Sequence, residues 1–143
     1  MEWLKPILEA IPDGAIAVAK DGTILYANRF MSENTGIHSG MTLAEVVQGF
    51  DVRSMDGRAL TLAGLPETRA LAGEDVREAL VRLWAPGAGE AVVLLVNGRP
   101  VRDVVGRVVA AVMVSRPISY ELALAIQVRQ LSAQMSDHDA VRV

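Results

Sequence analysis

Three β-rich segments follow one another in the second half of the chain, and this succession constrains the fold more than any other feature. The segments run over Val76 to Trp84, Ala91 to Val101 and Arg107 to Ser115. Only Pro86-Gly87-Ala88-Gly89 and the stretch Asp103 to Gly106 separate them, and both are rich in turn-forming residues. Strands joined by such short turns favour an antiparallel sheet.

Two shorter strands are predicted before this group. Ala15 to Ala19 is apolar and Thr23 to Ala27 is β-rich, and Asp21-Gly22 between them is a strong signal for a two-residue hairpin. Asn97-Gly98 has a similar form but lies inside the segment Ala91 to Val101, where it predicts a bulge or bend instead of a turn. The sequence therefore predicts five strands in all.

Helices are predicted around these strands. From Trp3 to Ile11 the apolar residues recur every three or four positions, as on one face of a helix. Asn28 precedes the next helical segment and is interpreted as its structural cap rather than as a ligand-binding residue. The other predicted helices begin at the capping box Thr42 to Glu45, at Pro66 and at Ser119.

The predicted fold is α+β: a five-stranded antiparallel sheet with short helices on one face, flanked by an N-terminal and a C-terminal helix. The polar stretch from Asp51 to Gly64 is predicted to be irregular. The expected boundaries are residues 1–12 for the N-terminal helix, 13–116 for the core domain, and 117–143 for the C-terminal helix and a frayed tail.

Composition and charge exclude several classes of function. The 143 residues carry a formal net charge of −3, with 14 basic residues scattered among 17 acidic ones, which argues against direct binding to nucleic acid. The lack of cysteine excludes disulfides and thiolate metal sites, and fits a cytoplasmic location. The longest apolar stretch, Val108 to Val114, is far below the roughly 20 residues of a membrane helix, so no membrane partner is expected.

Three stretches of the sequence resemble the PAS domain family. Leu8 to Asn28 looks like the end of the family's opening helix with its first hairpin and asparagine, and Leu65 to Val76 resembles the later helix that leads into the third strand. Pro100 to Val114 is similar to the family's final hairpin. Together these stretches cover most of Leu8 to Ser115, and the resemblance implies a bacterial sensory module and not an enzyme.

The chain departs from the family pattern where the last strand ends. Family members often leave this strand through an Asp-Ile-Thr-like tripeptide that helps to couple the domain to the following helix. Pro117-Ile118-Ser119 stands at this place, so the carboxylate of the family's ionic contact is missing. The resemblance therefore leaves open how the domain is coupled to its C-terminal helix.

The resemblance also bears on cofactors. Covalent flavin light sensors of the family use a cysteine in the helix after the second strand, and Asn28-Arg29-Phe30-Met31 offers none. Haem-binding relatives usually take an axial histidine from the helix that here spans Pro66 to Ala72, which has none. Both cofactors are disfavoured, whereas a non-covalent flavin or a small apolar ligand stays open.

A ligand cavity is expected between the sheet and the short helices, with a filled core as the alternative. The candidate pocket residues are Val18, Ile24, Met31, Val46, Leu71, Leu95 and Val112. No acid–base pair for catalysis is recognisable, because most carboxylates, Glu67 among them, fall at predicted turns or helix starts. His38 is interpreted as a surface turn residue.

The first functional hypothesis is a homodimeric sensor that binds a small ligand or partner and signals through its flanking helices. The residues expected at the dimer interface are Trp3, Ile7, Leu124, Val128 and Leu131, the last three in a coiled-coil seam of under two heptads. The downstream effector would be a histidine kinase of a two-component system, a transcription regulator or a cyclic-dinucleotide enzyme. Two alternatives are a ligand-free adaptor and a small isomerase-like enzyme, which would need an inward-facing carboxylate on a strand.

Overall fold

A six-stranded antiparallel sheet forms the centre of the structure, a computed structural model that describes residues 4–142 and the side chains of residues 5–135. The strands lie side by side in the order β2-β1-β6-β5-β4-β3. Their bounds are Gly14–Ala19 (β1), Ile24–Ala27 (β2), Asp51–Arg53 (β3), Val76–Trp84 (β4), Val92–Arg102 (β5) and Val108–Ile118 (β6). The expected class is thus correct, but the number of strands is six and not five.

The additional strand is β3, within the stretch that was expected to be irregular. It contributes three residues, which pair with Arg82, Leu83 and Trp84 at the end of β4. Only Val52 of β3 is buried. A strand with a single inward side chain has no alternation that a sequence pattern could reveal, which explains why it was missed.

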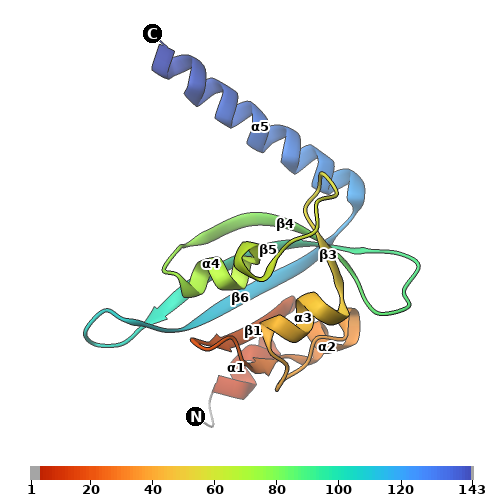
Figure 1. Ribbon diagram of the computed structural model, residues 1–143, viewed down its shortest axis with the longest axis vertical. Helices are drawn as coiled ribbons and strands as arrows, with labels where there is room; N and C mark the ends of the chain where they lie inside the picture. The colour runs from red at the N-terminus through yellow and green to blue at the C-terminus, as the bar shows by residue number, and fades with distance from the viewer. Residues whose placement is uncertain (1–3, 143) are drawn as a thin grey trace.

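Short helices cover one face of this sheet (Figure 1). The helices on that face are α2 (Arg29–Thr35), α3 (Leu43–Gly49) and α4 (Pro66–Leu71), with the single 3₁₀ turn η1 (Leu62–Gly64) before α4. The main hydrophobic core lies between them and the sheet, and it includes Val18, Met31 and Met113. This layer arrangement places any core cavity beneath α4 and its neighbours.

The two flanking helices behave differently. Helix α1 (Leu4–Ala10) lies against the opposite face of β1, where Leu8 packs on Ala15 and Ala17. Helix α5 (Tyr120–Arg142) follows β6 and extends away from the sheet, so that the two ends of the described chain lie at opposite ends of the molecule (Figure 1). Helix α1 is therefore packed along the sheet, whereas α5 contacts the sheet only near its beginning.

Asn28 joins three of these elements at a buried position. Its Oδ1 accepts hydrogen bonds from the backbone N–H groups of Met31 and Ala15, each at 3.0 Å, so it caps α2 and holds β1. Its Nδ2 donates to the carbonyl oxygens of Leu8 at 3.1 Å and Asp13 at 2.9 Å. The side chain uses both its acceptor and its donor group to tie α1 and β1 to α2.

The irregularity expected at Asn97-Gly98 lies in the neighbouring strand. Strand β5 continues through both residues, whereas β4 has a bulge between Val76 and Ala79. The extra residue is Glu78, which has a φ of 50° and whose backbone N–H donates to Asn97 Oδ1 at 2.9 Å. The Asn-Gly pair therefore marks the bulge by supplying its hydrogen-bond partner.

Candidate functional site

A small cavity lies in the core beneath α4. Its volume is about 30 Å³, which is the share of space that one water molecule takes in the liquid. Residues of α2, α3, α4 and four strands border it, and all but two of their side chains are apolar. The two polar side chains are Glu67 and Ser115. The core is thus nearly filled, and its residual space has a polar corner.

The predicted pocket residues from the first half of the chain reach the core. Val18, Ile24, Met31, Val46 and Leu71 are all buried in the main hydrophobic cluster. Only Met31 and Val46 border the cavity. Leu71 borders a separate surface pocket, near the point where Lys20 Nζ donates to the Leu71 carbonyl oxygen at 2.7 Å.

Leu95 and Val112 were expected to face the core cavity, but they lie on the opposite face of the sheet. In each strand the residue that faces the core is one position away from the expected one. In β5 the core side chains are Leu94 and Val96, so the alternation of a strand turns Leu95 away from the short helices. In β6 the core position is Met113, and Val112 lines a groove on the outer face. Both strands are apolar on both faces, so the sequence did not mark which side is inward.

Glu67 was placed by the sequence at the start of a helix, and the structure shows that it also faces the core cavity. The residue is partly exposed overall, but burial of its side chain raises the pKa of the carboxyl above its ordinary value. The hydrogen bond from its own backbone N–H opposes this effect only in part. An acidic residue after a helix-start proline gave no sequence signal for this orientation, because the same pattern occurs at solvated helix starts.

The outer side of β4 is attached to α5 at the bulge. Arg129 of α5 makes an ion pair with Glu78 at 2.7 Å, and Gln130 Nε2 donates to the Glu78 carbonyl oxygen at 2.8 Å. A cleft of about 630 Å³ lies beside these contacts, between α5, β4 and the start of α4. Pro66 and Val81 border both this cleft and the core cavity, so they form the wall between the two spaces.

A second contact holds the start of α5. The guanidinium of Arg82 lies 4.9 Å from the centre of the Trp84 ring and 5.3 Å from that of Tyr120. Ser119 Oγ accepts the backbone N–H of Leu122 at 3.1 Å and so caps the helix. Arg82 therefore connects β4 to α5, near the position where the family's exit carboxylate is missing.

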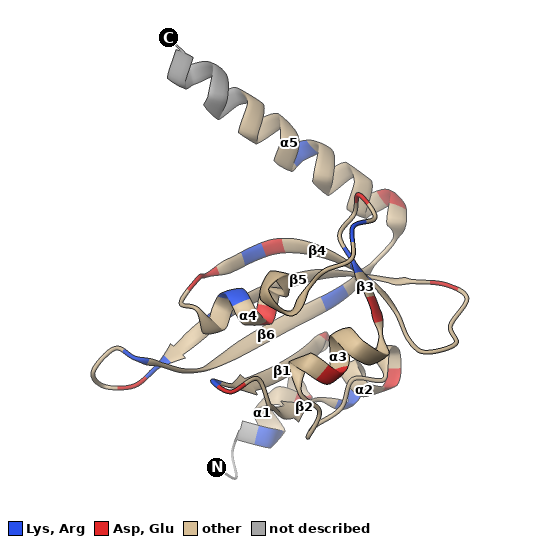
Figure 2. Ribbon diagram, in the orientation of Figure 1, with Lys and Arg blue, Asp and Glu red and all other residues tan. Residues whose placement is uncertain are grey.

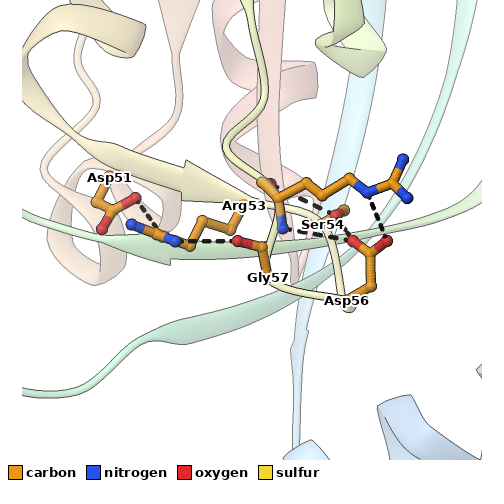
Figure 3. Close-up of polar contacts among 6 residues, drawn as sticks. Asp51, Arg53, Ser54, Asp56 and Gly57 are labelled. Atoms are coloured by element: carbon orange, nitrogen blue, oxygen red, sulfur yellow. Dashed lines mark hydrogen bonds and ion pairs between the residues drawn. The ribbon is translucent and has the colours of Figure 1, made fainter.

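A polar turn borders the same cleft. In Figure 3, Arg53 binds Asp51 at 2.8 Å and the Gly57 carbonyl oxygen at 2.9 Å, while Asp56 accepts from Ser54. These bonds fix the turn that follows β3, and Asp56 also pairs with Arg58 at 3.2 Å. The hydrogen bond from Ser54 lowers the pKa of the Asp56 carboxyl, with a smaller contribution from the Arg58 backbone N–H.

The turn also carries an apolar contact to α5. Met55, at its apex, is buried in a small cluster with Val93 of β5 and Ala123 of α5. Together with the contacts at Glu78 and Arg82, this cluster fixes the first turns of α5 to the outer side of the sheet.

The predicted dimer residues on α5 are exposed on one side of the helix. Leu124, Val128 and Leu131 are 39%, 62% and 52% exposed, and Met135 continues their spacing. The buried residues Ala123 and Ile126 face the rest of the molecule instead. Ile7 is also exposed, and Trp3 lies outside the described residues.

Few charges interrupt this surface. Between residues 120 and 135, α5 carries only Glu121 and Arg129, whereas charged residues of both signs are spread over the sheet and its loops (Figure 2). Among the side chains of residues 5–135, no three histidine, aspartate or glutamate residues gather closely enough to hold a metal ion. None of the helices within residues 4–142 has the length and apolarity needed to cross a membrane.

Comparison with known proteins identifies the fold. The family model described as PAS fold matches residues 8–122. A solved light-oxygen-voltage domain, studied with a flavin analogue, is 17% identical with a TM-score of 0.67, and the match covers 92% of this chain and 96% of that one. None of the curated protein sequences matches the chain significantly.

Two further solved structures show the same architecture. The dark structure of the Aureochrome1 blue-light photoreceptor domain is 19% identical with a TM-score of 0.63, and the match covers 91% of this chain and 93% of that one. The PAS domain of nitrogen regulation protein NR(II) from Vibrio parahaemolyticus is 18% identical with a TM-score of 0.53, and the match covers 80% and 97%. At these identities the likeness concerns the fold alone.

Proposed function

Because this chain belongs to the PAS family, we propose that it is a sensory module in which changes in the core are transmitted by β4 to α5 and read out by a dimer of two copies. The observation that carries the proposal is the attachment of α5 to the β4 bulge at Glu78, through Arg129 and Gln130. The same strand supplies Val81 and Leu83 to the core cavity. One strand therefore contacts both the proposed input and the proposed output.

The contacts of β4 offer a coupling route that does not need the family's exit carboxylate. Arg82 lies between Val81 and Leu83 in the chain, and alternation turns it to the outer face, where it meets Tyr120 at the start of α5. A shift of β4 that follows a change in the cavity would move Arg82 and Glu78 together. Pro117-Ile118-Ser119 would then serve only as a connection and a helix cap.

The exposed seam of α5 supports pairing with a second copy. A stripe at four-, three- and four-residue spacing with few charges is the pattern of a two-stranded coiled coil. Since it covers under two heptads, we expect its pairing to be weak without help from the rest of the domain. Helix α1 leaves Ile7 exposed next to the sheet, and we propose that it contributes to the same dimer.

The seam can be tested by paired substitutions on α5. We expect Leu124→Glu with Leu131→Glu to weaken dimerisation at least tenfold, because two buried charges in a short seam cost more than its apolar contacts supply. Leu122→Glu is the matched control: Leu122 is similarly exposed, at 49%, but lies on another side of the helix. Sedimentation velocity over a concentration series measures the dissociation constant, and a wild-type protein that stays monomeric contradicts the proposal.

The connection through Arg82 has its own test. We expect Arg82→Met to raise the hydrogen-exchange rate of the first turns of α5 roughly two- to fivefold, the effect of losing an interaction of about 0.5–1 kcal/mol. Methionine keeps most of the packing volume and removes the charge that lies over Tyr120. Arg58→Met, at an exposed loop position, should leave the exchange of α5 unchanged. Equal exchange in both variants would rule out a role for Arg82 in holding α5.

The nature of the input follows from the size of the cavity. Binding pockets for small molecules usually have volumes of roughly 300–1,000 Å³, so a flavin ring does not fit the present core of about 30 Å³. A bulky apolar ligand would need the core to open. We therefore favour an input that needs almost no space over a large cofactor, and place the output in a downstream kinase, transcription regulator or cyclic-dinucleotide enzyme.

Catalysis is the weaker alternative. Glu67 is a carboxyl that faces a cavity, which an isomerase-like enzyme would need, but it stands on α4 and not on a strand. Among the described residues, no second titratable side chain borders the cavity, and there is no room for a substrate beside it. The geometry supports a sensing role for this residue better than an acid–base role.

A further inference from the structure

We propose that Glu67 is the input site of this module and that the signal it senses is a proton. The inference rests on the proposed function, because it names the input that the core transmits to α5. Glu67 faces a cavity the size of one water molecule, and Ser115 is the only other polar side chain on its wall within the described part of the chain. A carboxyl in this place can change its charge without any ligand entering the core.

Among the described residues, Glu67 is the only ionisable side chain on the wall of the cavity, although Lys20 Nζ donates to the Leu71 carbonyl oxygen at the other end of α4 at 2.7 Å. The charged residues on the strands packed against α4 are Arg77, Glu78, Arg82, Arg99, Arg102 and Arg116, and none of them borders the cavity. On α4 itself, Arg69 is paired with Glu74 and is exposed. The neutral form is therefore the one that suits the closed core, which agrees with the raised pKa of this carboxyl.

Ionisation would have to move the start of α4. A carboxylate that loses its proton among apolar walls is stable only when water or a positive charge reaches it. Pro66 directly precedes Glu67 and forms part of the wall between the cavity and the cleft beside α5. The same cleft is bordered by Gln127 and Gln130 of α5. Outward movement of Glu67 would thus push Pro66 into the cleft that is bordered by Gln127 and Gln130 of α5.

The direction of the pH effect follows from the pKa. With a folded-state pKa above the ordinary value of 4.5, the folded protein holds a proton that the unfolded chain has lost, so stability falls as pH rises above about 4.5. Asp21 and Asp56 act in the opposite direction: hydrogen bonds lower their pKa values, and their contribution is lost as pH falls below about 4. Between about pH 5 and 8, a loss of stability towards higher pH is therefore the signature of Glu67, because the raised pKa of Tyr26, about 12, affects stability only above about pH 10.

The experiment compares the wild-type chain with Glu67→Gln and Glu67→Leu between about pH 5 and 8. For wild type we expect the exchange rate of α5 amides, corrected for intrinsic exchange, to rise about tenfold or more with pH. Both variants should give a nearly flat profile, because glutamine mimics the neutral acid and leucine removes the group. His38→Gln should keep the wild-type profile, since His38 lies on the exposed surface.

Two outcomes decide the inference. If Glu67→Gln keeps the pH dependence of wild type, Glu67 is not the proton site. If neither variant folds, the carboxyl band of wild-type protein in isotope-edited infrared spectra decides: a Glu67 carboxyl that is already ionised at pH 5 overturns the inference, and one that stays protonated supports it.

The same data separate this inference from the proposed function. If dimerisation depends on the α5 seam but the exchange of α5 does not change with pH, the proposed sensory function is supported and the proton is not its input. If the exchange of α5 changes with pH through Glu67 but the seam variants dimerise like wild type, Glu67 is the proton site and the proposed output through the α5 seam is wrong.

Discussion

Replacement of Asn28 by alanine is expected to lower the free energy of unfolding by about 4 kcal/mol, which is a large fraction of the stability of a small domain. The variant loses the cap of α2 and the hydrogen bonds from Asn28 to the Ala15 N–H and the Asp13 carbonyl oxygen, whereas the Leu8 carbonyl oxygen still accepts from the Ile11 N–H at 3.3 Å. Each buried group left unsatisfied costs more than the bond itself contributes. Urea denaturation followed by circular dichroism measures the change.

Two further variants test whether the buried hydrogen bonds of Asn28 cause this loss of stability. Asn34→Ala changes the same residue type at an exposed position of α2 and should alter the unfolding free energy by less than about 0.5 kcal/mol. Asn28→Asp keeps the acceptor for Met31 and Ala15 but loses both donors, so an intermediate loss is expected. A loss in Asn28→Ala no larger than in Asn34→Ala would mean that the buried hydrogen bonds are not what holds α1 and β1.

The second large effect concerns Gly98 in the middle of β5. A Cβ atom at this position would lie 2.2 Å from Met113 Sδ and 3.0 Å from the Val112 carbonyl oxygen. Met113 is fully buried, so its side chain has no free space to move into. We expect Gly98→Val to destabilise the protein by about 3 kcal/mol through overpacking, although valine is otherwise favourable in strands.

A double substitution tests the cause. If Met113 is the obstacle, Gly98→Val with Met113→Ala should be less destabilised than the sum of the two single variants by at least about 1 kcal/mol. Gly89→Val is the matched control, because a Cβ atom at Gly89 meets no atom within 4 Å. Additive losses in the double variant would show that the strain arises elsewhere. Thermal unfolding of the four variants provides the comparison.

Local sequence signals predicted most of the fold. Asp21-Gly22 marks the hairpin between β1 and β2, but its loop is one residue longer than the two residues expected. Lys20 and Asp21 form the centre of the turn, the Gly22 N–H donates to the Ala19 carbonyl oxygen at 2.9 Å, and Gly22 has a positive φ of 91°. Asn28 stands where a strand becomes a helix, and its side chain has the acceptor that a cap needs. These features depend on neighbours in sequence, so they could be read without knowing the tertiary structure.

Features that depend on distant neighbours could not be predicted. The sequence of β5 and β6 is apolar on both faces, so the inward side was misjudged at Leu95 and Val112. The short strand β3 exists only because β4 offers its edge. The position of Glu67 depends on how α4 packs over the sheet, and helix-start acids are usually solvated. For the candidate site, the sequence therefore predicted apolar residues of the core but not that the Glu67 carboxyl faces the cavity.

The short length of β3 has a further consequence for the edge of the sheet. β3 pairs with β4 only from Arg82 to Trp84, which leaves the first part of β4 without a neighbouring strand on that side. The Gln130 side chain satisfies one exposed backbone acceptor there, at Glu78. When α5 moves away, an open strand edge becomes available for intermolecular pairing. The protein with α5 displaced from β4 should therefore aggregate more readily than the protein with α5 bound to β4, unless a partner strand or helix covers that edge.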